Sequence, residues 1–142
     1  MLSHSFSTPV NASIDQVWTL LVDKIENPQR YVKSVEKSQV LEKYQDGVLR
    51  EMEVGGMKLK ERITVDEANR EIKFTLVDNA LFSGEIINKI DVFEPENTLT
   101  LTFTQNWQPL NAEAQKIYDK EMTQAIKNAV LHTKDLAQQQ ES

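Results

Sequence analysis

The apolar residues near the start of the chain recur with helical spacing. Val17, Trp18, Leu21 and Ile25 fall on one face of a helix of 3.6 residues per turn. The segment Ser13-Ile14-Asp15-Gln16 that precedes them is typical of a capping box, in which the serine and glutamine side chains satisfy free backbone N–H groups. Asn27-Pro28 then predicts the start of a second, short helix, because proline at the first helical position loses no hydrogen bond.

A second helical pattern extends from Asn111 to about Gln138. Its apolar and small residues form one stripe, and charged residues occupy the rest of the surface. The stripe contains Ala114, Tyr118, Met122, Ala125, Ile126, Ala129, Thr133 and Leu136. At about 1.5 Å per residue this helix would be roughly 40 Å long, which is enough to cross a whole domain.

Between these two regions the period changes to two. In residues 57–66, 71–76 and 98–107, apolar residues alternate with polar ones, as in strands with one buried and one solvated face. Short turn sequences such as Gly55-Gly56 separate the runs, so we expect antiparallel hairpins rather than crossover connections. Together with a first strand near Ser5–Val10, the pattern predicts seven strands.

Several polar residues share the buried phase of these strands. If Gly55-Gly56 is a two-residue turn, Arg50 lies opposite Glu61 on the apolar face of the hairpin, where the two would form an ion pair. The same reasoning for the last hairpin places Asn88 and Gln105 on the inner face as diagonal neighbours. Four strands would then each carry one inward polar side chain.

Two interpretations of these polar residues remain open. A buried polar group without a partner costs about 1–3 kcal/mol, so four of them favour a wet cavity that holds a ligand over a dry core. In the other interpretation a β-bulge turns part of a strand over, and Arg50 and Glu61 form a solvated cross-strand pair. We favour the cavity.

Composition narrows the class of function. At 142 residues we expect a single domain over residues 1–142. The net charge of −6 opposes nucleic-acid binding, and no apolar segment approaches the roughly 20 residues that span a membrane, so we expect neither partner. With no cysteine and with His4 and His132 near opposite ends, we expect no metal site and no cofactor. The first residues lack a secretory signal, which predicts a cytoplasmic protein.

The order of the predicted elements resembles the helix-grip fold of the START/Bet v 1-like superfamily, also called SRPBCC or the polyketide cyclase/dehydrase and lipid transport superfamily. Residues 6–18, FSTPVNASIDQVW, look like the first strand and capped helix of that family, and 26–31 with 84–90 are similar to its AtaL-like branch. The resemblance implies an α+β fold. A curved antiparallel seven-stranded sheet would wrap around the long C-terminal helix, with two short helices between strands 1 and 2. Members leave a cavity there for hydrophobic ligands such as lipids, sterols and polyketides.

The residues that face inward are the candidates for the wall of such a cavity. They are Arg50, Met52, Leu59, Glu61, Phe74, Leu76, Asn88, Ile90, Phe103, Gln105, Trp107, Tyr118, Met122 and Ile126. Leu81-Phe82 is an apolar pair in a loop that would normally be polar, so it is a candidate portal or partner contact. The glycine-rich loop of the plant Bet v 1 proteins is absent, and we therefore expect no plant-hormone or nucleotide ligand.

Three functions are compatible with this pattern. The leading hypothesis is a binding or carrier protein for a small, mostly hydrophobic ligand whose polar or anionic group Arg50 would meet. The second is a cyclase or dehydratase-like enzyme for a polyketide-type substrate, with Glu61 as general acid or base, although no histidine is predicted in the cavity. The third is a protein-interaction module that uses Leu81-Phe82. We expect a monomer or a weak homodimer in each case.

Overall fold

The computed structural model describes residues 4–32, 35–93 and 98–139. Within them, a seven-stranded antiparallel sheet has the order β1-β8-β7-β5-β4-β3-β2, and β6 and β9 form a second, small sheet. The strands are β1 (His4–Val10), β2 (Val35–Tyr44), β3 (Gly47–Val54), β4 (Met57–Asp66), β5 (Glu71–Leu76), β6 (Phe82–Ser83), β7 (Glu85–Phe93), β8 (Thr98–Gln105) and β9 (Gln108–Pro109). The helices are α1 (Ile14–Glu26), the 3₁₀ helix η1 (Pro28–Arg30), α2 (Ala112–Ile117), the π-helical η2 (Tyr118–Met122) and α3 (Thr123–Gln139).

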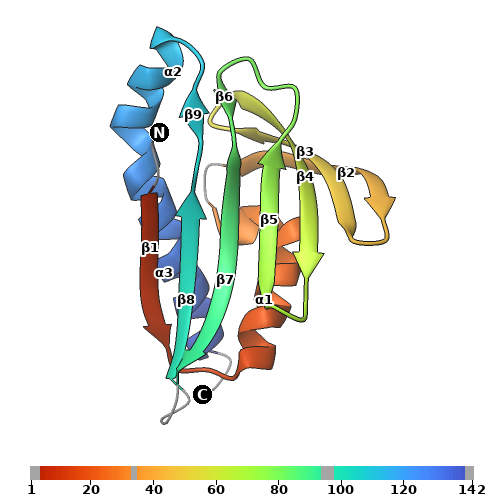
Figure 1. Ribbon diagram of the computed structural model, residues 1–142, viewed down its shortest axis with the longest axis vertical. Coiled ribbons are helices and arrows are strands. Elements are labelled where there is room, and N and C mark those ends of the chain that lie inside the picture. The colour runs from red at the N-terminus through yellow and green to blue at the C-terminus, as the bar shows by residue number, and fades with distance from the viewer. Residues whose placement is uncertain (1–3, 33–34, 94–97, 140–142) are drawn as a thin grey trace.

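Both long helices lie on the same face of the large sheet (Figure 1). Helix α3 packs against β1 and β8 and also contacts α1, which in turn touches β7 and β2. A sheet with one apolar face and helices with one apolar stripe bury each other in this way. The α+β helix-grip architecture expected from the sequence is therefore confirmed.

The buried apolar residues form two clusters. The first core cluster lies between the sheet and the helices α1 and α3, and includes Val17, Leu21, Ile63, Ile72, Phe74, Ile90, Leu101, Phe103, Ile126 and Val130. The second core cluster lies near α2 and η2, and comprises Val35, Met52, Leu59, Phe82, Trp107, Ala114 and Tyr118. Together they leave the polar residues of the inner face surrounded by apolar side chains.

The capping box at the start of α1 is confirmed. The Ser13 hydroxyl accepts a hydrogen bond from the backbone N–H of Gln16 at 3.1 Å, and Gln16 Oε1 accepts one from the backbone N–H of Ser13 at 3.1 Å. The predicted apolar face of α1 is buried, and η1 begins at Pro28 as expected. The two helices predicted between β1 and β2 are therefore confirmed as α1 and η1.

The register of the two central hairpins is also confirmed. Gly55 and Gly56 have φ values of 56° and 79°, the left-handed conformation that a two-residue hairpin turn requires at both positions. Arg50 consequently lies opposite Glu61, and Asn88 lies opposite Phe103 in the β7–β8 pair. The bulge interpretation is wrong for this face, because the irregular register falls in β2 and the β3–β4 pairing is continuous.

The C-terminal helix differs from the uninterrupted helix expected over residues 111–138. Asn111 caps α2 through a hydrogen bond from the backbone N–H of Ala114 at 2.9 Å, but the π-helical η2 separates α2 from α3. A π turn holds one extra residue, which rotates the following side chains by about 100° relative to a continuous α-helix. Tyr118 belongs to the second core cluster and Ile126 to the first.

Candidate functional site

A cavity of about 410 Å³ lies between the inner face of the sheet and the helices. Its size is within the usual range for sites that bind small molecules. Most of its wall is apolar, and it extends from the first core cluster into the second. The predicted residues that line it are Arg50, Met52, Leu59, Glu61, Phe74, Asn88, Phe103, Gln105, Trp107 and Ile126.

Other predicted wall residues lie elsewhere. Ile90 is buried within the first core cluster, and Leu76 packs beside the second. Tyr118 is buried as well, and its ring stacks on that of His4 with centroids 5.3 Å apart. The side chain of Met122 lies outside the described residues. Ile90, Leu76 and Tyr118 therefore pack within or beside the two core clusters but do not line the cavity.

Burial disfavours the candidate portal or partner contact at Leu81-Phe82. Phe82 is 1% exposed, its ring centroid is 5.2 Å from that of Trp107, and Leu81 is half-buried. The side chain of Asn79 accepts hydrogen bonds from the backbone N–H groups of both residues, which folds the loop back. Strand β6 then pairs with β9 and places Phe82 opposite Pro109 in the interior.

Arg50 and Glu61 form the predicted ion pair, and the pair is buried. Arg50 Nη2 lies 2.6 Å from Glu61 Oε1, and each side chain is 3% exposed. Arg50 Nη1 donates to the carbonyl oxygens of Lys24 and Ile25 at 3.2 and 3.0 Å. These carbonyls belong to the last turn of α1, where a cation is favourable. Arg50 thus connects the β3–β4 hairpin to α1 at the cavity wall.

Lys24 is a residue of the cavity wall that the sequence analysis missed. It lies on α1, is 7% exposed, and donates a hydrogen bond to Asn88 Oδ1. Its Nζ is 4.1 Å from the ring centroid of Phe103 and 5.0 Å from that of Phe74. Burial, and secondarily the charge of Arg50, lower the pKa of Lys24 from 10.5 to about 7, against an opposing effect of Glu61.

A sequence signal for Lys24 did exist. It follows Val17 and Leu21 by seven and three positions, so it continues their helical stripe toward the core. Lysine in an amphipathic helix normally lies on the solvated face, so Lys24 was not among the residues predicted to line the cavity. Only the packing of α1 over Asn88 and Phe103 shows that the amine reaches the cavity.

Three polar atoms of the wall are buried hydrogen-bond donors without a protein acceptor in the described part of the chain. They are Arg50 Nε, Asn88 Nδ2 and Trp107 Nε1. Each such donor costs about 1–3 kcal/mol when it is left unpaired. A molecule that fills the cavity and carries oxygen acceptors would remove this cost.

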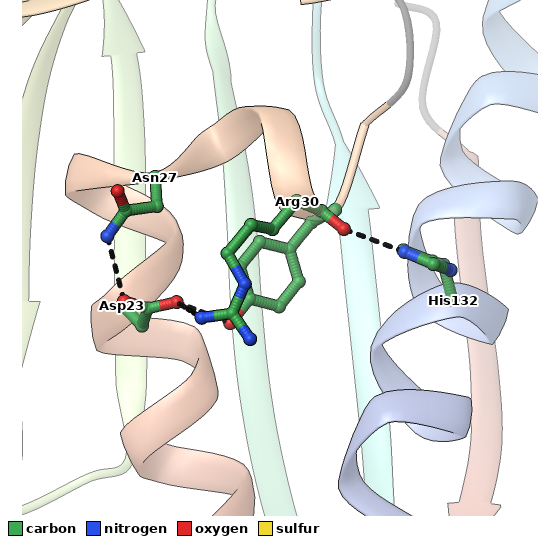
Figure 2. Close-up of polar contacts among 5 residues, drawn as sticks. Asp23, Asn27, Arg30 and His132 are labelled. Atoms are coloured by element: carbon green, nitrogen blue, oxygen red, sulfur yellow. Dashed lines mark hydrogen bonds and ion pairs between the residues drawn. The ribbon is translucent and has the colours of Figure 1, made fainter.

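One side of the cavity is held by a polar network centred on Asp23 of α1 (Figure 2). Its carboxylate accepts hydrogen bonds from Asn27 Nδ2 at 2.9 Å, Arg30 Nη1 at 2.6 Å and the Tyr31 hydroxyl at 2.8 Å. Burial and this bond to Asp23 raise the pKa of Tyr31. His132 of α3 makes a 2.7 Å hydrogen bond to the backbone oxygen of Arg30. The network fixes the segment from 28 to 32, which contributes to the cavity wall.

Metal ligation and membrane insertion are two further properties that a chain can show in its side-chain clusters and helices. Across the described ranges, no three histidine, cysteine or acidic side chains gather in a way that could hold a metal ion. Every helix in the described part of the chain is too short or too polar to cross a lipid bilayer.

Comparison with known proteins places the chain by family. The family model described as acetylaranotin biosynthesis cluster protein L, AtaL, matches residues 5–140. No curated protein matches the sequence.

Solved structures resemble the chain over nearly its whole length. The Zhui aromatase/cyclase from Streptomyces sp. R1128 is 18% identical, with a TM-score of 0.82 over 99% of this chain and 96% of that one. A START superfamily protein from Mycobacterium smegmatis is 15% identical, with a TM-score of 0.74 over 97% and 98%. A point mutant of norcoclaurine synthase from Thalictrum flavum is 13% identical, with a TM-score of 0.74 over 99% and 96%. These likenesses establish the START/Bet v 1-like fold.

Proposed function

The chain belongs to the AtaL family, and we propose that it is a binding or carrier protein for a small, mostly apolar molecule with oxygen acceptors. The molecule occupies the cavity between the sheet and the helices. Its apolar body contacts side chains such as Met52, Leu59 and Phe74, and its acceptor group meets Arg50 and its neighbours.

One observation carries this proposal: an apolar cavity whose unpaired buried polar groups include three donors. An apolar wall alone would select ligands by size, whereas unpaired donors select for a complementary acceptor. The cationic groups of Arg50 and Lys24 favour a carbonyl, carboxylate or phenolate oxygen at the same place. A donor-rich ligand would leave these N–H groups unpaired and would bind more weakly.

The first test uses the fluorescent probe 1-anilinonaphthalene-8-sulfonate, which combines an apolar body with anionic oxygens. Met52→Trp fills part of the cavity and should weaken probe binding by about tenfold or more, or about 1.4 kcal/mol. Lys58→Trp introduces the same side chain at an exposed position and should leave the affinity unchanged. Near-ultraviolet circular dichroism checks that both variants are folded. A folded Met52→Trp protein with undiminished affinity would contradict the proposal.

Mass spectrometry of gently purified protein provides a second test. We expect small apolar molecules with carbonyl, carboxylate or phenolate groups to copurify with the chain. The same molecules should be depleted from Met52→Trp and retained by Lys58→Trp. Recovery of the same amounts from both variants would place the bound molecules outside the cavity.

A cyclase or dehydratase-like enzyme for a polyketide-type substrate is the second candidate function. It is favoured by Lys24, which offers a group able to exchange a proton near neutral pH, beside Glu61 as a carboxylate in the same wall. The two functions differ in what happens to the bound molecule. A carrier releases it unchanged, whereas an enzyme releases a cyclised or dehydrated product that mass spectrometry detects.

A further inference from the structure

We propose that Lys24 forms a reversible imine with an aldehyde or ketone that occupies the cavity. This inference rests on the proposed function and specifies the ligand as a carbonyl compound with an apolar body. The amine of Lys24 is the nucleophile, and the cavity supplies the space for the carbonyl carbon beside it.

The position of Lys24 is unusual for a lysine with a structural role. A buried lysine that stabilises a fold normally pairs with a carboxylate. Here the carboxylate in the same wall, Glu61, is bound to Arg50, and Lys24 forms no ion pair among the described residues. Its Nζ instead rests on the ring of Phe103 and is held by the amide oxygen of Asn88.

The charge state of Lys24 suits a nucleophile. With a pKa of about 7, roughly half of the side chain carries a neutral amine at neutral pH. An exposed lysine is neutral in about one molecule in a few thousand under the same conditions. Only the neutral amine has the lone pair that attacks a carbonyl, and lysines in apolar pockets are activated in this way.

The reaction needs no oxidant, reductant or metal. The lone pair of Lys24 Nζ attacks the carbonyl carbon, a C–N bond forms, and the carbonyl oxygen takes up a proton to give a carbinolamine. The C–O bond of the carbinolamine then breaks, its hydroxyl group leaves with the one remaining amine proton as water, and a C=N double bond forms to give the neutral imine. Addition of water reverses each step, so the ligand is released unchanged.

The surrounding donors fit the oxygen of such a ligand. Asn88 holds Lys24 through Oδ1, and its Nδ2, on the same amide carbon, is unpaired among the described residues. Arg50 Nε is a second unpaired donor of the wall. Hydrogen bonds to a carbonyl oxygen draw electron density from its carbon and stabilise the negative charge that develops during attack.

The test uses 2-naphthaldehyde with sodium cyanoborohydride, which reduces an imine to a stable secondary amine. Intact mass and peptide mapping of the full chain should show one adduct, on Lys24, formed at least about tenfold faster than adducts on exposed lysines such as Lys58. The rate at Lys24 should level off above about pH 7, whereas the rate at Lys58 continues to rise. Lys24→Arg retains a cationic side chain without the amine nucleophile and should abolish the fast adduct, and so should Lys24→Met.

Two controls separate the imine from simple binding. Without the reductant, 2-naphthaldehyde should displace 1-anilinonaphthalene-8-sulfonate from the wild-type protein. The analogue 2-methylnaphthalene has the same ring but no carbonyl group, so it measures binding of the ring without an imine. The imine is overturned if no selective Lys24 adduct forms, whether or not the aldehyde displaces the probe, or if Lys24→Arg retains the fast adduct. The proposed function fails separately if probe binding is insensitive to Met52→Trp.

Discussion

Arg50 and Glu61 form a buried ion pair with Nη2 and Oε1 2.6 Å apart. The guanidinium also binds the last carbonyls of α1, so one side chain joins the β3–β4 hairpin to a helix. A buried ion pair of this kind often contributes little net stability, because both charges lose their hydration. The pair is best understood as a group that fixes the position of a charged cavity wall.

Removing either member of this pair should destabilise the protein strongly, and removing both should cost less than the two single losses added together. Arg50→Leu or Glu61→Leu leaves an uncompensated buried charge, which costs about 3–5 kcal/mol. The double variant leaves neither charge, so its loss should be clearly smaller than the sum of the two single losses. Urea unfolding of the four proteins measures the coupling.

The exposed pair of Glu51 and Lys58 on the outer face serves as the control for this cycle. Its charged atoms are 3.8 Å apart and the Lys58 side chain is 65% exposed, so its removal should change the free energy of unfolding by less than about 1 kcal/mol. Strictly additive losses at Arg50 and Glu61 would show that the two charges do not interact.

Lys24 should make the free energy of unfolding increase with pH. Its pKa in the folded state is about 7, against 10.5 for an unperturbed lysine. Below about pH 7 Lys24 is protonated in both states, and the folded state carries the cost of a buried charge beside Arg50, which Glu61 offsets only in part. Between about 7 and 10.5 the unfolded state binds more protons, so rising pH stabilises the folded state.

Comparison with Lys24→Met isolates this effect from the other titrating groups. The stability advantage of Lys24→Met over the wild type should shrink by on the order of a few kcal/mol from about pH 7 to about pH 10. Lys58→Met removes an exposed lysine, and its difference from the wild type should stay flat over the same range. If the difference in free energy of unfolding between Lys24→Met and the wild type does not change with pH, the amine of Lys24 in the wild type has an ordinary pKa.

Asp23 should be more important for the cavity than its partial exposure indicates. Its carboxylate accepts three side-chain hydrogen bonds that hold the segment containing Pro28 and Val32, both of which line the cavity. Asp23→Ala should cost about 1–3 kcal/mol in urea unfolding. It should also weaken binding of 1-anilinonaphthalene-8-sulfonate, because part of the wall loses its support.

His132→Ala is the matched comparison for Asp23. It removes one hydrogen bond, from the His132 ring to the backbone oxygen of Arg30, whereas Asp23→Ala removes three, so its effect on both measurements should be smaller. A larger effect for His132→Ala than for Asp23→Ala would indicate that α3, rather than α1, holds this segment in place.

The fold and the polar part of the wall could be predicted from local signals. Two adjacent glycines fixed the turn between β3 and β4, and a period of two then placed Arg50 opposite Glu61 without any structural information. Asn88 and Gln105 followed from the same counting in the next hairpin. The register of a hairpin depends on the turn that joins two consecutive strands, so it can be predicted from the local sequence.

The remaining features depend on contacts between distant segments. Lys24 reaches the cavity because α1 crosses Asn88, which is 64 positions away. Phe82 is buried because β6 pairs with β9, a pairing that no alternation in a two-residue strand could indicate. The π turn at Tyr118–Met122 contains no proline or glycine from which it could have been predicted. Tertiary packing, rather than local sequence preference, determines the positions of Lys24 and Phe82.

Gly84 should tolerate no side chain, and its replacement should disturb the cavity. It has φ of 116°, and a Cβ atom there would lie 2.1 Å from the backbone oxygen of Asn106. Gly84→Ala therefore combines backbone strain with a clash against backbone, and we expect a loss of about 2 kcal/mol or more in urea unfolding. Because Ile86, Gln105 and Trp107 line the cavity on either side of this contact, binding of 1-anilinonaphthalene-8-sulfonate should weaken as well.

Gly55→Asn distinguishes the clash at Gly84 from the general cost of replacing a glycine. Gly55 also has a positive φ, of 56°, but nothing lies within 4 Å of its added Cβ, and asparagine accepts this conformation readily. Its stability should change by less than about 1 kcal/mol. Equal losses for the two variants would mean that positive φ alone, and not the close approach of β7 to the end of β8, explains the glycine at position 84.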